Sequence, residues 1–335
     1  MKPTRLHRRL ALTLVSASMI ASLASCDSAI YDDEGDCSIA YKVKFSYERN
    51  IQFRELFPEQ VRSVELYAFD PDSHRLLWSG TETGNALADP DYTMSLPLPA
   101  GDYDLVAWCG HVGSDHFTLA PQGRAADVQT LDQLICRLNR TAAESSDDLT
   151  PLFHGMVSRV NLPDTFGTVI TRLVPVMKNT NRIHVEFTSN NGHPIDPSGF
   201  EIYITDCNGV MNYDNALLSD ETITFRPWTT DFEGEKPLEF RTSMTTARLM
   251  TDGKTRLTVI RKKDGEKIID LLLPSLLAQA KAQYNRPMSD QEYLDRQDEH
   301  ILRFTLAGDP GYETWYIEAG LYINSWRVVI NNPDL

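Results

Sequence analysis

Alternating hydrophobic and polar residues dominate the first half of the chain and predict short β-strands. In residues 39–47 every second residue is apolar or aromatic, which is the two-residue period of a half-buried strand. Residues 61–69 form a second apolar run, and a Pro- and Asp-containing turn at 71–74 follows it. Further strands are predicted at 76–78, 92–98 and 103–108, with one helical excursion at 127–138. Short strands separated by Pro and Gly favour a β-sandwich.

The strand pattern restarts after residues 163–167, which we interpret as the boundary between two domains. Further strands are predicted at 168–177, 182–188, 200–205, 222–225, 245–250, 256–260, 268–273, 301–306 and 314–318. A Leu- and Ala-rich stretch at 274–283 predicts a helix that begins on a proline. Ser289 and Glu292 have the spacing of a capping box and predict a second short helix. One last strand is predicted at 320–330.

These patterns predict an all-β protein with two β-sandwich domains, at residues 38–163 and 164–335, and a short helical insertion in the second. A chain of 335 residues is long enough for two domains of ordinary size. A hydrophobic content of 41% is enough for packed cores. Beyond the N-terminal region, no stretch is long and apolar enough to cross a membrane as a helix.

The first 25 residues have the layout of a lipoprotein signal peptide. Four basic residues precede an apolar stretch at 10–23, which is too short to span a bilayer. Leu23, two small residues and Cys26 follow, so Cys26 is predicted to be the first mature residue and to carry lipid. Two or more acyl chains there would anchor the protein stably. The alternative is an ordinary cleaved signal that contains a cysteine. Residues 26–37 are acidic and are predicted to form a tether.

The acidic composition argues against one class of partner. The chain has 32 Lys and Arg against 47 Asp and Glu, a formal net charge of −15. Removal of the predicted leader removes four basic residues and no acidic one, which leaves 28 against 47 and a net charge of −19. Such a surface repels phosphate backbones, so we expect no nucleic-acid partner.

No arrangement of residues predicts catalysis, a metal site or a cofactor. His111 and His116 flank Asp115 but lack a third ligand at a telling spacing, and the turn at 70–74 lacks the spacing of a calcium loop. The serines lack the context of a nucleophile elbow, and no glycine-rich phosphate loop is present. We therefore expect a protein that is not an enzyme. The five tryptophans lie mostly on or beside predicted strands, where core packing competes with a role as a sugar platform.

Four cysteines remain after Cys26: Cys37, Cys109, Cys136 and Cys207. An even number in an exported chain permits disulfides, and the sequence leaves their pairing open. The spacings match no zinc site. The alternative is a set of buried free thiols, which is common for cysteine.

Several short motifs together resemble the lipoprotein anchor subunits of Bacteroidales fimbriae, the FimB-like group related to fimbrillin. They are LASC at 23–26, CDSAIYDD at 26–33, LPAGDY at 98–103, AWCG at 107–110, LFHG at 152–155, MSDQEYLDR at 288–296 and INSW at 323–326. Each motif is weak alone. Their order and their spread over nearly the whole mature chain make the resemblance specific.

This resemblance implies a fold, a location and a role. The fold would be two transthyretin-like β-sandwich domains, in a lipid-anchored protein exposed on the outer membrane. The role would be to seat a fimbrial shaft of fimbrillin-type subunits and to limit its length, without enzymatic activity. The acidic run at 32–34 resembles a surface-export signal of that family. The resemblance supplies no cofactor and no residue-level binding site.

The last predicted strand is a candidate docking element for a shaft subunit. In β-augmentation, an unpaired sheet edge accepts a strand through main-chain hydrogen bonds and alternate side-chain pockets. Alternation places Tyr322, Asn324, Trp326 and Val328 on one face of this strand. The alternative is that the strand only completes the second domain. A second class of function also stays open, a surface lipoprotein that binds glycans or a host protein.

Overall fold

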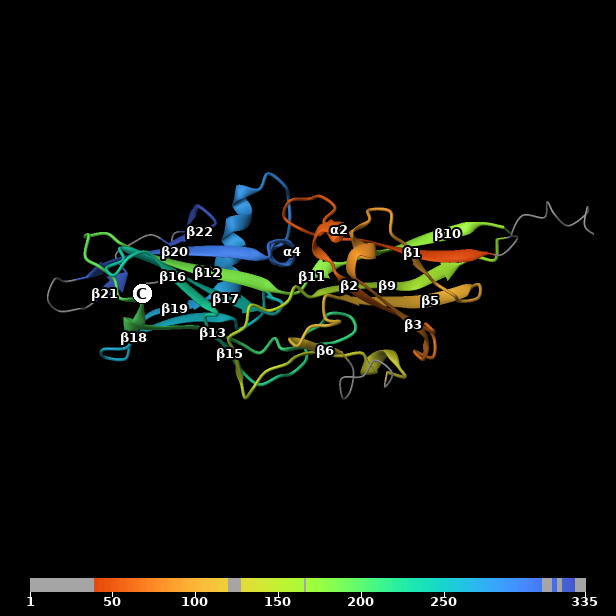
Figure 1. Cartoon of the computed structure of the whole chain (residues 1–335), viewed down its shortest axis with the longest axis horizontal. Coiled ribbons are helices and arrows are strands. Elements are labelled where there is room, and N and C mark those ends of the chain that lie inside the picture. Colours follow the sequence, from red (N-terminus) through yellow and green to blue (C-terminus); the bar gives the residue numbers. More distant parts are fainter. Residues whose placement is uncertain (1–38, 120–127, 166, 309–314, 318–320, 329–335) are drawn as a thin grey trace, which may run out of the picture.

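Two β-sandwiches follow one another along the long axis of the molecule (Figure 1). The structure, a computed structural model, describes residues 39–119, 128–165, 167–308, 315–317 and 321–328. The predicted signal peptide at 1–25, the lipidated Cys26 and the tether at 26–37 with Cys37 lie outside these residues. Among the described residues, no helix combines the length and the apolar character that crossing a membrane requires.

The first sandwich pairs a three-stranded sheet with a five-stranded sheet. The three-stranded sheet has the order β10-β1-β4, with β10 (Val169–Pro175), β1 (Ala40–Ser46) and β4 (Met94–Ser95). The five-stranded sheet has the order β11 (Met177–Lys178), β9 (Phe153–Leu162), β5 (Gly101–Cys109), β2 (Ser63–Phe69) and β3 (Leu76–Thr83). The one-turn helix α2 (Phe57–Gln60) and a 3₁₀ turn (Gly84–Ala88) lie between strands. A core of aromatic and aliphatic side chains, Val43 and Phe45 among them, fills the space between the sheets.

The central strands of the five-stranded sheet are buried on both faces. All seven residues of β2 are buried, so this strand shows no alternation of exposure. Val64 and Leu66 pack into the core of the first sandwich, whereas Tyr67 and Phe69 pack into a cluster that continues into the second. Residues of a small sheet also belong to that cluster; its order is β14 (Val210–Met211), β7 (Cys136–Leu138) and β6 (Phe117–Leu119). The two sandwiches therefore share one continuous hydrophobic cluster.

The second sandwich consists of a seven-stranded and a five-stranded sheet. The first has the order β16 (Thr229–Phe232), β17 (Glu239–Thr246), β12 (Asn181–Ser189), β20 (Glu299–Gly308), β22 (Leu321–Ile323) and β23 (Trp326–Val328), with β21 (Trp315–Ile317) also on β20. The second has the order β19 (Glu266–Leu272), β18 (Arg256–Arg261), β13 (Phe200–Asp206), β15 (Ile223–Phe225) and β8 (Glu144–Ser145). Phe187 stacks between Phe240 and Phe304 in its core, at centroid distances of 4.7 and 5.7 Å.

The helical insertion lies between β19 and β20, as predicted for the second domain. It consists of α3 (Leu273–Leu277), a 3₁₀ segment (Ala278–Gln283) and α4 (Asp290–Arg296). Pro274 stands in the first turn of α3, where its missing N–H costs no hydrogen bond. The Ser289 hydroxyl caps α4 by accepting from the Glu292 N–H at 3.1 Å. The helical excursion predicted at 127–138 is wrong, because the described residues 128–138 form a 3₁₀ turn (Leu131–Gln133) and strand β7 instead of an α-helix.

The chain passes from the first sandwich to the second later than the predicted domain boundary. Strand β10 follows residues 163–167 but pairs in parallel with β1 over its whole length. The chain then adds β11 to β9 and crosses to the second sandwich between β11 and β12. In the opposite direction, β8 joins a sheet of the second sandwich by pairing with β15. The two halves thus exchange short strands, and the division at residue 163 stays a prediction.

The single strand predicted at 320–330 is wrong, because the described part of this segment forms a hairpin. Strands β22 and β23 are joined by Asn324 and Ser325, whose φ angles are 47° and 74°. Positive φ at both central residues matches the right-handed twist of a two-residue hairpin. Asn tolerates this conformation better than most residues, which lets the chain reverse there without a glycine.

Candidate functional site

A loop of the first sandwich is fixed to helix α4 of the second, and this contact defines the junction between them. We call residues 47–56, between β1 and α2, the junction loop. The Ile51 N–H donates to the carbonyl oxygen of Arg296 at 2.9 Å. In return, the Arg296 guanidinium donates to the carbonyl oxygens of Glu48 and Asn50, at 3.1 and 3.4 Å. Main-chain groups of the loop are therefore held directly by the last turn of α4.

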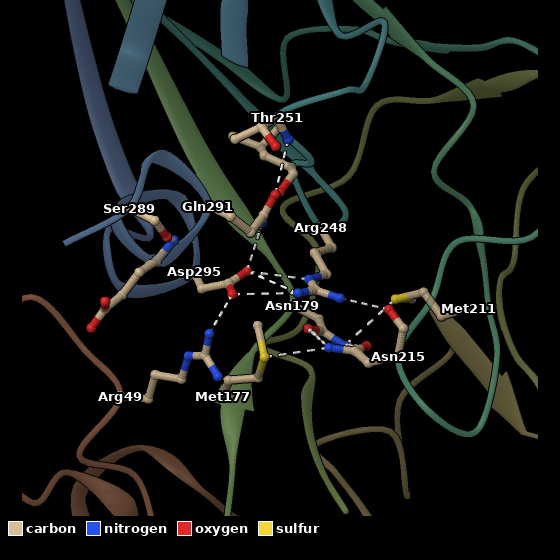
Figure 2. Close-up of polar contacts among 12 residues, drawn as sticks. Arg49, Met177, Asn179, Met211, Asn215, Arg248, Thr251, Ser289, Gln291 and Asp295 are labelled. Carbon is tan, nitrogen blue, oxygen red and sulfur yellow. Dashed lines mark hydrogen bonds and ion pairs between the residues drawn. The ribbon is translucent and has the colours of Figure 1, made fainter. Parts of the chain in front are cut away.

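Asp295 of α4 is the charged centre of the junction (Figure 2). Its side chain is 1% exposed and accepts from Arg49 of the junction loop at 2.7 Å. Arg248, which follows β17, donates to it at 3.1 Å, and Gln291 donates at 2.9 Å. A buried carboxylate is tolerated only when it is paired and hydrogen-bonded. Because its partners come from both sandwiches, Asp295 joins the two halves.

The connection between the sandwiches is held by the same network. Asn179 lies between β11 and β12, and its amide pairs reciprocally with that of Asn215 at 2.6 and 3.0 Å. Both asparagines are buried, so the pair satisfies amide groups that water cannot reach. Arg248 donates to the Asn215 carbonyl oxygen at 2.6 Å. Figure 2 shows that this arginine links the asparagine pair to Asp295.

Phe53 of the junction loop lies under two arginines of the second sandwich. The guanidinium carbon of Arg286 is 4.1 Å from the centre of its ring, and that of Arg296 is 4.8 Å away. Phe53 has a φ of 54°, which is strained for a bulky residue. The two cation–π contacts help to offset this strain.

Two shallow grooves follow the solvent side of β1 and β10 beside this junction. The larger, of about 690 Å³, is lined by Leu173 and Pro175 of β10, by Arg49 and Phe53 of the junction loop, and by residues from the helical insertion such as Arg286. The smaller, of about 390 Å³, extends from Leu173 along β1 toward α2. Leu173 is 53% exposed and borders both grooves.

The structure separates the four predicted docking residues. Tyr322 lies on β22 opposite Arg327 and is 39% exposed, whereas Val328 lies on β23 opposite Leu321. Trp326 pairs with Ile323, which is fully buried. Asn324 forms the turn, and its side chain accepts from the Ile301 N–H of β20 at 2.7 Å. The hairpin therefore presents Tyr322 and the outer edge of β23, while Asn324 is tied to its own sheet. Because a turn separates the two strands, the predicted docking residues do not lie on one strand: Tyr322, Asn324, Trp326 and Val328.

The described cysteines form no disulfide with one another. Cys109 and Cys136 are buried, Cys207 is half-buried, and all three are free thiols. Burial raises the pKa of both Cys109 and Cys136 well above the ordinary value, so these thiols are protonated at neutral pH. Within the described residues no group of three metal-binding side chains occurs.

The two candidate metal ligands, His111 and His116, contact other side chains of the protein. His111 contacts Glu65 at 2.8 Å, and His116 contacts the Thr150 hydroxyl at 2.9 Å. Among the tryptophans whose side chains are described, Trp108 is fully buried, and Trp78 and Trp228 are half-buried.

Two other histidines are buried near the junction. His154 of β9 lies against Trp108 at a centroid distance of 4.6 Å and contacts the Tyr213 carbonyl oxygen at 2.7 Å. Burial lowers the pKa of His154 to about 4. His300 of β20 is fully buried, and burial lowers its pKa to about 4 as well. Both are therefore neutral packing residues at physiological pH.

The stretch 288–296 is one of the motifs that carry the family resemblance, but its sequence did not indicate a role in the junction. That stretch contains Gln291, Asp295 and Arg296, all of which act in the junction. Helical spacing places Asp295 on the same face as Gln291, four residues earlier, which donates to it, but nothing in that spacing predicts that the carboxylate is buried. Its partners Arg49 and Arg248 are far away in the sequence and carry no local signal.

Comparisons with known proteins point to one group. The family model described as fimbrillin-A associated anchor proteins Mfa1 and Mfa2 matches residues 33–332. The minor fimbrium anchoring subunit Mfa2 of Porphyromonas gingivalis is 26% identical over 267 residues, which are 78% of this chain and 78% of that protein.

Solved structures show the same similarity. A candidate polysaccharide binding protein from Bacteroides thetaiotaomicron is 31% identical and superposes with a TM-score of 0.77, over 89% of this chain and 100% of that one. The fimbrial anchor protein Mfa2 from Porphyromonas gingivalis is 20% identical, with a TM-score of 0.67 over 87% of this chain and 99% of that one. The second of these shows the fold.

Proposed function

Because the chain belongs to the family of fimbrillin-A associated anchor proteins, we propose that it tethers a fimbrial shaft to the outer membrane through lipid on Cys26. Its role at the cell surface is that of a fimbrial anchor subunit. The finer parts of the proposal are the lipid attachment, the docking of fimbrillin-type shaft subunits and the limit on shaft length. The single observation that carries it is the match of the family model to residues 33–332.

The shape of the molecule supports this role. The described chain starts at Ile39, next to β1, at one end of the long axis, and β18 and β21 lie toward the other end (Figure 1). A lipid on Cys26 would hold the first sandwich near the membrane and direct the second away from it. The junction around Asp295 would keep the two in line.

The C-terminal hairpin remains a candidate for contact with the shaft. In the described residues, strand β23 forms one edge of the seven-stranded sheet, and Tyr322 on β22 is exposed. An outer strand can pair with a strand of another subunit. Truncation before Leu321 is expected to abolish shaft anchoring while the lipidated first sandwich stays at the surface.

Substitution of the lipidated residue tests the proposal. In cells that carry Cys26→Ser, the protein and its fimbriae should leave the membrane fraction and appear in the culture medium. Cys207→Ser is the matched control, because this half-buried thiol lies in the second sandwich and has no lipid to carry. If Cys26→Ser cells keep both the protein and anchored fimbriae in the membrane fraction, the lipid anchor is refuted.

A second candidate function is glycan binding, which the name of the Bacteroides thetaiotaomicron relative favours. A glycan-binding module should retain affinity for a polysaccharide as an isolated protein, and loss of the gene should leave fimbriae attached. An anchor should co-purify with shaft subunits, and its loss should release long free fimbriae. These two outcomes separate the candidates.

A further inference from the structure

Strand β10 has a free edge in the part of the chain that the structure describes. The Ala40 N–H donates to the Thr168 carbonyl oxygen, and the Val176 N–H donates to the Ser46 carbonyl oxygen. In a parallel pair, hydrogen bonds to one neighbour come from alternate residues. The even-numbered residues of β10 therefore bond to β1. The N–H and C=O groups of Val169, Thr171 and Leu173 point the other way, where no described strand pairs with them.

The side chains along this edge are apolar and exposed. Val169 is 63% exposed and Leu173 is 53% exposed, with the exposed Thr171 between them on the same face. Residue Val174, on the opposite face, is buried in the core of the first sandwich. The edge thus combines unpaired main-chain groups with two apolar side chains at alternate positions, which is what an added strand contacts.

Several other edges in the described residues carry protection that β10 lacks. Strand β19 has three charged residues (Glu266, Lys267 and Asp270) among its seven. The start of β3 is covered by the hydrogen bond from the Leu76 N–H to the Gln129 carbonyl oxygen. Strands β4, β8 and β11 are only two residues long. Short or charged edges discourage pairing with another chain.

The only charged residue of β10 does not guard its edge. Arg172 turns its guanidinium to the Asn161 carbonyl oxygen of β9, at 2.8 and 2.5 Å. Beyond Pro175 the strand leads into the 690 Å³ groove, where Arg286 lies exposed on the Phe53 ring. Arg286 pairs with no acidic side chain of the described residues, whereas the neighbouring Arg49 and Arg296 pair with Asp295 and Glu292. An acidic group on an added strand would find a cation there.

We propose that the free edge of β10 is the acceptor for an extended strand of a fimbrial shaft subunit, with an acidic residue of that strand against Arg286. The added strand would become the fourth strand of the sheet β10-β1-β4. It would contact Val169 and Leu173 and end in the groove at the junction. This inference rests on the proposed anchoring function and gives a docking site distinct from the C-terminal hairpin.

Thr171→Pro tests the main-chain part of this proposal. Proline removes the outward N–H of residue 171 but leaves the hydrogen bonds between β10 and β1, because those come from the neighbouring residues. Loss of that donor should reduce shaft capture about tenfold. Thr171→Ser keeps the N–H and is the matched control. Unchanged thermal unfolding of both variants would show that the sheet is intact.

Leu173→Lys and Arg286→Glu test the side-chain part without a change to the backbone. Leu77→Lys is the control for Leu173→Lys, because Leu77 is similarly exposed (49%) on the edge strand β3. Two quantities are measured on intact fimbriated cells. One is the set of proteins that cross-link to a photoreactive residue placed at position 173 or 77 of the full chain, and the other is the amount of shaft protein that the cells retain. We expect cross-links to shaft subunits from position 173 alone, and loss of retention in Leu173→Lys and Arg286→Glu.

The outcomes separate this inference from the proposed function. If deletion of the whole chain releases fimbriae but Thr171→Pro and Leu173→Lys retain them, the β10 site is refuted and the anchor function stands. If deletion leaves fimbriae attached, the anchor function itself fails. Cross-links from position 173 to a second copy of this chain, or equal cross-linking from position 77, would also overturn the β10 site.

Discussion

Replacement of Asp295 by Asn should destabilise the protein far more than removal of any one exposed ion pair. The Asp295 side chain is 1% exposed, and Arg248, which pairs with it, is 12% exposed. Without the carboxylate, Arg248 is left as a buried cation with no compensating charge. Breaking a buried pair in this way costs about 3–5 kcal/mol. The Asn side chain also turns an N–H₂ group toward arginine donors, which adds to the cost.

Two further variants set the scale for this effect. Arg49→Gln removes a partner that is 46% exposed and can be rehydrated, so the expected cost is about 1 kcal/mol or less. Asp290→Asn, also on α4, removes an ion pair to Lys281 in which the aspartate is 52% exposed, and should change stability by less than about 0.5 kcal/mol. The ranking Asp295→Asn, then Arg49→Gln, then Asp290→Asn follows from burial alone.

Urea unfolding of the purified chain, followed by tryptophan fluorescence, measures these differences. Because a hydrophobic cluster continues from the first sandwich into the second, the wild-type chain should unfold in one main transition. Asp295→Asn should lower the midpoint and separate the transition into two, since the junction is weakened. A cost below about 1 kcal/mol, or the same cost for Asp295→Asn and Asp290→Asn, would refute the argument from burial.

Three other predictions follow from the described residues. The pKa of His154 and of His300 is about 4 in the folded protein and about 6.5 when unfolded, so the unfolded chain binds more protons between these values and stability falls as pH drops. At pH 5 each of the two histidines should lower the free energy of unfolding by about 2 kcal/mol relative to pH 8. A urea midpoint that does not change over this pH range would contradict the prediction. Gly155→Ala places Cβ 2.4 Å from the Pro175 carbonyl oxygen and should cost about 1–3 kcal/mol, whereas Gly199→Ala meets no atom within 4 Å and should change the thermal midpoint little. In a chain without Cys26 and Cys37, a thiol reagent should label Cys207 quickly but Cys109 and Cys136 only after unfolding; fast labelling of all three would show that the buried sites open readily.

The sequence predicted elements whose signals are local. Strand β13 alternates buried and half-buried residues along its whole length, because one face of its sheet meets the core and the other meets solvent. Helix α4 follows a serine cap, and α3 begins with a proline, which are signals contained within one turn. These elements therefore form where the pattern places them.

The pattern of hydrophobic and polar residues does not predict long-range strand pairing or unusual turns. Nothing local indicates that β10 pairs with β1, about 130 residues earlier in the chain, so the sequence pattern could not place this strand in the sheet of β1. The chain reverses at Asn324 and Ser325 without a glycine and within an apolar run. The hydrophobic pattern therefore predicts one uninterrupted strand there. The same limit applies to Asp295, whose charge partners lie on separate segments that only the fold brings together.

The arrangement of strands has a mechanical consequence for an anchor. If the chain is held at Cys26, a pull on the shaft loads β1 along its own axis through the tether. Strand β1 lies between β10 and β4 and is parallel to β10 over seven paired residues. A pull along the strand direction loads these main-chain hydrogen bonds in shear, so several must break together. Force that passes beyond the first sandwich then meets the junction loop and the Asp295 pairs, where a buried charge would have to be exposed before the halves could separate. In an anchor held at Cys26, the connection from membrane to shaft would be continuous through paired strands and buried ion pairs, and Asn179 and Asn215 reinforce the chain where it passes from β11 to β12.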